Sequence, residues 1–117
     1  MRSLIFANIA SGATLSGNVD LSQLGGGLHA VKVPANVTSG GMFIQGAFST
    51  TSADFARVQR AYPNSGDINI TLVGSLAAGN LLPMPDEIQL PFAQYVRLET
   101  TNAQTDTRTF TLLATRL

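Results

Sequence analysis

Apolar and polar residues alternate along most of this chain in short runs, and turn-forming residues separate the runs. The clearest example is INITLVG at residues 68–74, where Ile68, Ile70 and Leu72 occupy every second position. Successive side chains of a β-strand point to opposite faces, so a period of two predicts strands with one buried face. Strands or extended segments are expected at residues 2–9, 13–27, 28–34, 42–48, 68–74, 87–90, 95–99 and 109–115.

Glycine and proline divide these runs. The triplet Gly25-Gly26-Gly27 predicts a flexible turn, because glycine adopts positive φ at little cost. Pro34 cannot donate to a strand ladder and is expected to end the strand before it. PNSG at residues 63–66 is a strong turn signal, residues 54–62 fit a short helix or a turn, and the prolines within residues 76–94 argue against a helix there.

The spacing of these elements predicts the fold class. About seven or eight short strands, with a turn signal about every 8–12 residues, are typical of an all-β antiparallel β-sandwich or jelly roll. The length suits one domain spanning residues 1–117, and the sequence contains neither an internal repeat nor a linker.

The alternation also predicts which side chains form the core. Alternation places His29, Val31 and Val33 on one side of a strand (with Ala30 and Lys32 on the other) and Met42, Ile44 and Phe48 on one face of the next. Val96, Leu98, Phe110 and Leu112 are expected to fill the core. Most of the six phenylalanines are expected to be buried. Residues 94–117 are expected to form a terminal hairpin with Arg97, Glu99 and Arg108 facing outward, where they pair across strands or with a neighbour.

Composition narrows the possible partners and compartments. Charged residues make up 12% of the chain, and seven basic residues balance seven acidic ones. No global field attracts nucleic acid or an anionic membrane, so neither is expected as a partner. The chain has no cysteine, which excludes disulfides and Cys-ligated zinc. The apolar part of the opening, residues 4–7, is too short for a signal peptide, so we expect a first strand and synthesis in the cytoplasm.

Candidate chemical groups do not converge in the sequence. His29 is the only histidine and is interpreted as a structural residue. Asp86 and Glu87 are adjacent, and neighbouring strand residues point to opposite faces, so they are interpreted as part of a solvated turn. The other aspartates lie among turn residues, where Asp commonly binds backbone: Asp20, Asp54, Asp67 and Asp106.

The remaining motifs also have plain interpretations. GGGLH lacks the Lys-Ser/Thr of a phosphate loop. The sequons at Asn36 and Asn69 are interpreted as chance matches, and Arg57 and Arg60, with Tyr62 nearby, as surface or interface residues. The sequence thus predicts no catalytic, cofactor-binding or metal-binding residue and no enzyme, and it does not identify the residues that bind a partner.

Three sections of the chain resemble small tailed-phage virion proteins. These are IASGATLSGNVDL at residues 9–21, GLHAVKVPANVTSGGMFIQGAFSTTSADFARV at residues 27–58, and the closing FAQYVRLETTNAQTDTRTFTLLATRL. The likeness consists of Ser-Gly-x-x-Leu-Ser near the start, a strand that runs into Pro-Ala, and Tyr-Val-Arg followed by a polar loop containing Gln. The sequence departs from the pattern at residues 37–41, where related proteins often have an aromatic residue.

The resemblance implies a virion structural protein, most directly a capsid decoration (cement) protein. Such proteins are often small all-β domains that clamp neighbouring major capsid proteins from outside the shell. The expected partner is then the major capsid protein, and the expected state is a homo-oligomer, with a trimer favoured over a dimer. The expected location is the capsid surface, reached after synthesis in the host cytoplasm.

Two other functions remain open at this point. A head-fibre, spike-base or tail-tip module would bind a receptor or glycan, although the chain has only Tyr62 and Tyr95 and no tryptophan to offer sugars. A cupin-type enzyme would need several histidine and carboxylate ligands, and one histidine argues against it. Residues 1–7 are a candidate arm that adds a strand to a neighbouring sheet.

Overall fold

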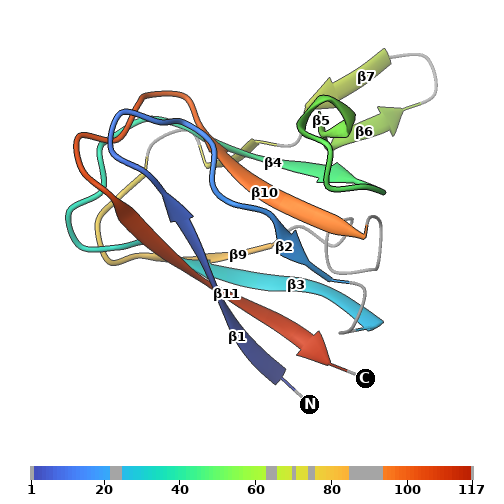
Figure 1. Cartoon of the computed structure of the whole chain (residues 1–117), viewed down its shortest axis with the longest axis horizontal. Helices are drawn as coiled ribbons and strands as arrows, with labels where there is room; N and C mark the ends of the chain where they lie inside the picture. Colours follow the sequence, from blue (N-terminus) through green and yellow to red (C-terminus); the bar gives the residue numbers. More distant parts are fainter. Residues whose placement is uncertain are drawn as a thin grey trace.

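The computed structural model describes part of the chain, at residues 2–21, 25–62, 66–69, 71–73, 76–84 and 94–116. Two antiparallel sheets pack face to face, with the apolar core between them (Figure 1). The predicted all-β antiparallel β-sandwich is confirmed, and eight strands lie along the two main sheet paths.

The first sheet has the strand order β1-β11-β3-β9. Its strands are β1 (Arg2–Ile9), β11 (Arg108–Arg116), β3 (Gly25–Lys32) and β9 (Leu81–Pro83). The long strands β1 and β11 pair over the whole of β1, from Arg2 opposite Thr115 to Ile9 opposite Arg108. Residues 2–7 therefore belong to a strand of the chain's own sheet, and their addition to a neighbouring sheet stays a prediction.

The second sheet has the order β2-β10-β4-β5, and β8 also pairs with β4. Its strands are β2 (Val19–Asp20), β10 (Tyr95–Thr100), β4 (Met42–Ala47), β5 (Ala56–Arg57) and β8 (Thr71–Val73). A separate two-stranded ribbon joins β6 (Gln59–Tyr62) to β7 (Gly66–Asn69), and one 3₁₀ turn, η1 (Ser52–Asp54), precedes β5. The predicted strand at 68–74 is thus divided between β7 and β8, which pair with different strands.

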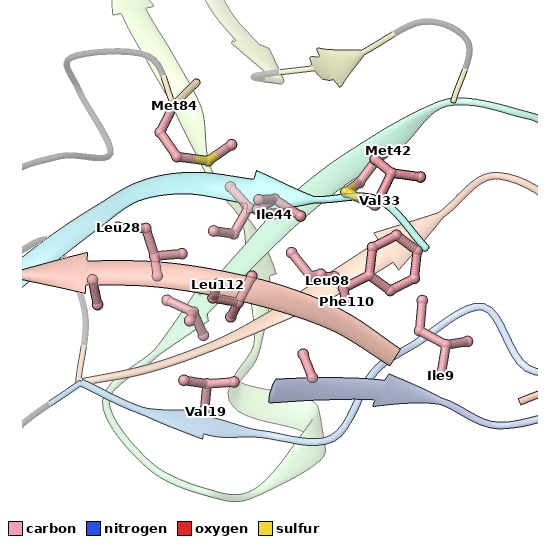
Figure 2. Packing of buried hydrophobic residues seen from close by; sticks show 14 of the residues in the cluster. Ile9, Val19, Leu28, Val33, Met42, Ile44, Met84, Leu98, Phe110 and Leu112 are labelled. Carbon is pink, nitrogen blue, oxygen red and sulfur yellow. The ribbon is translucent and has the colours of Figure 1, made fainter. Parts of the chain in front are cut away.

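The core fills the space between the two sheets (Figure 2). The largest fully buried hydrophobic side chains are Ile9, Leu28, Val31, Val33, Met42, Ile44, Val96, Leu98, Phe110 and Leu112. The predicted core positions at 96, 98, 110 and 112 are confirmed, and the positions predicted to share a face, 31 with 33 and 42 with 44, are buried as well. Each of these strands buries one face, as a period of two requires.

The closing segment is not a hairpin. β10 lies in the second sheet and β11 in the first, so residues 101–107 cross from one layer of the sandwich to the other. Val96 and Leu98 meet Phe110 and Leu112 across the core instead of alongside them in one sheet. Alternation shows only that each strand has one apolar face. Two such strands can lie side by side in one sheet or face each other across the core, and the pattern does not distinguish the two arrangements.

A β-bulge corrects the prediction for β3. Leu113 pairs with Ala30 and Ala114 with Leu28, so His29 is an extra residue in the ladder. The bulge reverses the alternation, and Leu28 is fully buried where His29 had been expected beside Val31. The strand also begins at Gly25, so the predicted Gly25-Gly26-Gly27 turn is wrong.

Two further expectations fail near strand ends. Phe48 is 81% exposed, because β4 ends at Ala47 and the chain bends there. Phe110 alone is buried among the phenylalanines whose side chains are described, so the expectation that most are buried is also wrong.

β9 was missed within a proline-rich stretch, and its Pro83 is tolerated because β9 is an edge strand. The strand expected at 87–90 lies outside the described residues.

Candidate functional site

The outer face of the first sheet carries a group of apolar side chains, and three of them are strongly exposed. Strand register places Leu4 opposite Leu113, Leu113 opposite Ala30, and Ala30 opposite Pro83. The next row places Phe6 opposite Thr111, which is opposite Lys32, and Lys32 is opposite Leu81. Directly opposite residues in an antiparallel pair share a face, so these two rows form one surface. We call it the apolar face, and its apolar members are Leu4, Phe6, Ala30, Leu81, Pro83 and Leu113.

Three large apolar side chains of the apolar face are strongly exposed to solvent. Leu4 is 64% exposed, and Phe6 and Leu81 are each 63% exposed. Lys32 is the one charged side chain on this face among the residues whose side chains are described. Single exposed hydrophobic residues are ordinary, but a group of them on one face of a sheet indicates a contact surface.

One edge of the same sheet is open. The backbone N–H of Gly17 donates to the carbonyl of Asn8 (3.1 Å), and Ile9 bridges Ser16, so the outer edge of β1 is closed at that end. Within a strand, backbone groups point to alternate edges. The outward groups of Phe6, Leu4 and Arg2 thus point the same way as those of Asn8, and no described strand pairs with them. We call this stretch, from Arg2 to Phe6, the free edge.

The outer face of the second sheet is polar and internally paired. Arg57 binds Glu99 with two hydrogen bonds, Nε to Oε1 (2.8 Å) and Nη2 to Oε2 (2.7 Å). Gln45 donates to Glu99 Oε1 (2.9 Å) and accepts from Arg97 Nε (2.6 Å), and Arg97 Nη1 donates to Ser52 Oγ (3.0 Å). Arg57 and Glu99 neutralise each other, whereas Arg97 binds the neutral oxygen atoms of Gln45 and Ser52, so the network keeps one net positive charge on a hydrogen-bonded guanidinium.

Aromatic rings support both guanidinium groups of this network. Arg57 lies 4.3 Å from the ring centroid of Phe43, and Arg97 lies 4.3 Å from that of Phe55. These cation–π contacts hold β5 against β4 within the sheet, and hold Phe55, which follows η1, against Arg97 on β10. The prediction that Arg97 and Glu99 pair across strands is confirmed, but their partners come from β4, β5 and η1 and not from β11.

The network makes a pH-dependent contribution to stability. Hydrogen bonds from Arg57 lower the pKa of Glu99, against the opposing effect of partial burial. Because the folded pKa is below the unfolded one, the contribution is complete above the unfolded value of about 4.3 and is lost as the pH falls through the folded value. Water screens the partly exposed Arg57, so the pair is worth about 0.2–1 kcal/mol.

We therefore expect Glu99→Gln to lower the melting temperature slightly at pH 7. The gap between variant and wild type should stay constant down to about pH 4.3 and shrink at lower pH. Thermal unfolding between pH 7 and pH 3 measures this. Arg57→Gln is the matched partner variant, and in its background Glu99→Gln should lose most of its effect. A gap that is as large at pH 3 as at pH 7 would contradict the assignment.

An open hollow of about 380 Å³ lies beside η1. Its lining includes Phe48, Asp54, Arg57 and Val58. Ser49 Oγ donates to the Asp54 carboxylate, and Arg57 is bound to Glu99, so the two charged groups are already engaged. The exposed ring of Phe48 is the feature here that a ligand could contact.

A buried glutamine ties the loops together at one end of the sandwich. Gln104 is 1% exposed, its Oε1 accepts from the backbone N–H of Thr38 (2.8 Å), and its Nε2 donates to the Asn102 carbonyl (3.3 Å) and Thr100 Oγ1 (3.4 Å). Its own backbone binds Gly12 (2.7 Å) and Ala13 (3.1 Å). This is the polar loop between β10 and β11, and its role in the structure is to hold three segments in place.

The residues considered for chemistry do not gather into one site. His29 is half-buried at the β3 bulge, Asp106 accepts from the Thr107 backbone (2.8 Å), and Asp54 binds Ser49. Asp20 lies on β2, in the second sheet. Arg57 belongs to the Glu99 network, whereas Asp86 and Glu87 lie outside the described residues. Among those described, no group of three or more His, Cys, Asp or Glu residues is placed to hold a metal ion.

Sequence reasoning missed the apolar face, although one signal was present. LIFA at residues 4–7 is continuously apolar, a pattern typical of strands covered on both faces. In the structure, Ala7 packs inward while Leu4 and Phe6 face solvent. The sequence of β1 is thus typical of a strand that is covered on both faces. Within the described chain, nothing covers the face that carries Leu4 and Phe6.

The described residues contain no helix long and apolar enough to cross a membrane. In comparisons with known proteins, no protein-family model, no curated protein and no solved structure matches the chain.

Proposed function

We propose that this chain is a non-enzymatic virion structural protein, a decoration (cement) protein that binds the outside of a tailed-phage capsid. Its partner is the major capsid protein, and it stabilises the contacts between neighbouring capsid subunits. The observation that carries this proposal is the apolar face, on which Leu4, Phe6 and Leu81 are each more than 60% exposed. The sequence resemblance to small tailed-phage virion proteins supplies the class of partner.

The physical requirements of cementing are modest and match this surface. A protein that binds the assembled shell but not separate subunits stabilises the shell by mass action. Many copies on a symmetric lattice multiply a weak contact through avidity. Such a protein needs a rigid scaffold with apolar contacts, and it needs neither cofactor, nucleic acid nor membrane. As a homo-oligomer, with a trimer favoured by the resemblance and a dimer as the other form, each particle presents several copies of the face.

Co-sedimentation with empty shells of the phage that encodes this chain tests the proposal. Wild type should pellet with the shells, and Leu81→Ser should weaken binding by about tenfold, as expected when a contact worth roughly 1.4 kcal/mol is lost. Phe48→Ser is the matched control, because Phe48 is also an exposed apolar residue but lies beside η1, away from the apolar face. Wild type that stays in the supernatant, or equal losses in both variants, would contradict the proposal.

A second function is favoured by a different observation. The 81% exposed ring of Phe48 borders the hollow that Asp54 and Arg57 also line, and exposed aromatic rings beside polar groups suit sugar binding. In this alternative the chain is a head-fibre, spike-base or tail-tip module that binds a receptor or glycan. A glycan array distinguishes the two: hits that Phe48→Ala abolishes would support the alternative, and an array without hits would count against it.

A further inference from the structure

The two edges of the first sheet differ sharply. β9 is three residues long and contains Pro83, which cannot donate to another strand. β1 is eight residues long, and from Ser3 to Ile9 it carries no charge and no proline. Natural sheets usually protect such an edge with charges, prolines or bulges. One edge of this sheet is therefore closed to further pairing, and the other lacks the usual protection.

The free edge requires a strand-shaped occupant. Within the described part of the chain, no strand pairs with the outward backbone N–H and C=O groups of Arg2, Leu4 and Phe6, which have the spacing that an antiparallel ladder satisfies. A second copy of the same edge supplies the same groups in reverse order, so antiparallel pairing of the two copies is self-complementary. No like charges are brought together between Ser3 and Ile9, because that stretch has none.

From these features we propose that two copies of the chain pair edge to edge through β1, about a two-fold axis, so that the homo-oligomer is the dimer and not the trimer that the resemblance favours. The bridge at Ser16 closes the edge beyond Phe6, so the register that uses every outward group places Leu4 opposite Leu4 of the second copy. Arg2 then lies opposite Phe6 of the second copy. Because the other edge ends in β9 with its Pro83, this pairing stops at two copies and does not continue into a filament.

The pairing changes the shape of the contact surface. The axis of an antiparallel strand pair is perpendicular to the sheet, so both apolar faces lie on the same side of one continuous sheet. Leu4 and Phe6 of each copy come together at the centre of the joined surface, with Leu81 toward its two outer ends. The apolar side chains of β1 thereby gain neighbours that they lack in the single chain. This inference stands on the edge itself and does not depend on the identity of the surface that the apolar face binds.

Disulfide trapping tests the register directly, because the chain has no cysteine of its own. Leu4→Cys places two thiols on directly opposite strand positions, where the Cα atoms are about 5.5 Å apart and within reach of a disulfide. Leu81→Cys is the matched control, since Leu81 is equally exposed on the same face but lies on the closed edge. Under mild oxidation at micromolar concentration, the Leu4→Cys variant should form a disulfide-linked dimer, whereas the Leu81→Cys variant should show no covalent dimer on denaturing electrophoresis. Equal cross-linking of both variants, or of neither, would overturn the proposal.

The mass of the unmodified protein gives an independent reading. Light scattering should find twice the chain mass of 12.3 kDa. Leu4→Pro removes an outward N–H and leaves the β1–β11 ladder intact, so it should reduce the mass to that of one chain, whereas Leu4→Val should remain a dimer. A monomeric wild type at 100 µM, or a trimer, would refute the pairing. Both experiments use the protein alone, so a failure here is distinct from a failure of the shell-binding experiment.

Discussion

Replacing Phe110 with alanine is expected to lower the free energy of unfolding by about 3–5 kcal/mol. Phe110 is fully buried on β11 and is the largest of the fully buried side chains. It lies in the cluster that both sheets share, together with Ile9, Leu98 and Leu112 (Figure 2). Its removal leaves a cavity between two layers that several other strands hold apart, so little relaxation can fill the space.

Urea unfolding of the two proteins measures this loss, and Phe48→Ala provides the control. Phe48 is 81% exposed, so its truncation should change stability by no more than about 0.5 kcal/mol. Phe110→Leu removes fewer atoms and should fall between wild type and Phe110→Ala. If Phe110→Ala and Phe48→Ala had equal effects, the assignment of the core would be wrong. The comparison also separates two phenylalanines that alternation in the sequence treats alike.

The sequence predicted the faces of individual strands more reliably than the relations between strands. Alternation correctly places Val31, Met42, Leu98 and Phe110 in the core, because the direction of a side chain is a local property of an extended backbone. Whether β10 and β11 pair or face each other depends on the path of residues 101–107. That path is fixed by contacts with distant segments, which no local pattern contains.

Local irregularity accounts for the other errors. A single bulge at His29 reverses the alternation in β3, so Leu28 takes the buried position beside Val31 instead of His29. No residue type in this segment predicts the bulge. A chain bend after Ala47 turns Phe48 to solvent. Gly40 shows another constraint that alternation does not contain. Its φ is +138°, and a Cβ atom there would lie 2.7 Å from Asn102 Nδ2, in a loop far away in the sequence.

The candidate site was the least predictable feature, for the same reason. Leu4, Leu81 and Leu113 come from three strands, and each is unremarkable in its own segment. They form one surface only because β11 and β3 lie between β1 and β9 in the first sheet. The continuous apolar run in β1 was the available clue, since it is typical of a strand with cover on both sides.

Replacing Gln104 with leucine is expected to lower the free energy of unfolding by roughly 1–3 kcal/mol, although the side chain keeps nearly the same size. The backbone N–H of Thr38 donates to Gln104 Oε1 at 2.8 Å, and the carbonyl of Asn102 accepts from Nε2 at 3.3 Å. Leucine can neither accept from the Thr38 N–H nor donate to the Asn102 carbonyl. Because Gln104 is only 1% exposed, both backbone groups would lose a hydrogen bond at a site with little access to water. The exposed Gln94 offers the matched control, because Gln94→Leu removes only a weak contact with the Tyr95 hydroxyl (3.5 Å).

The same substitution should loosen one end of the sandwich and leave the sheets intact. Thr38 and Thr105 also bind each other, so the loop at residues 37–41 depends on Gln104 and its neighbours for its position. Hydrogen exchange should therefore accelerate at the Thr38 amide in Gln104→Leu, with little change at Val96 or Leu112 in the central strands. Uniform acceleration across all strands would indicate global destabilisation, and unchanged exchange at Thr38 would remove Gln104 from this role. The polar loop between the last two strands would then be a simple connection and not the tie that holds three segments together.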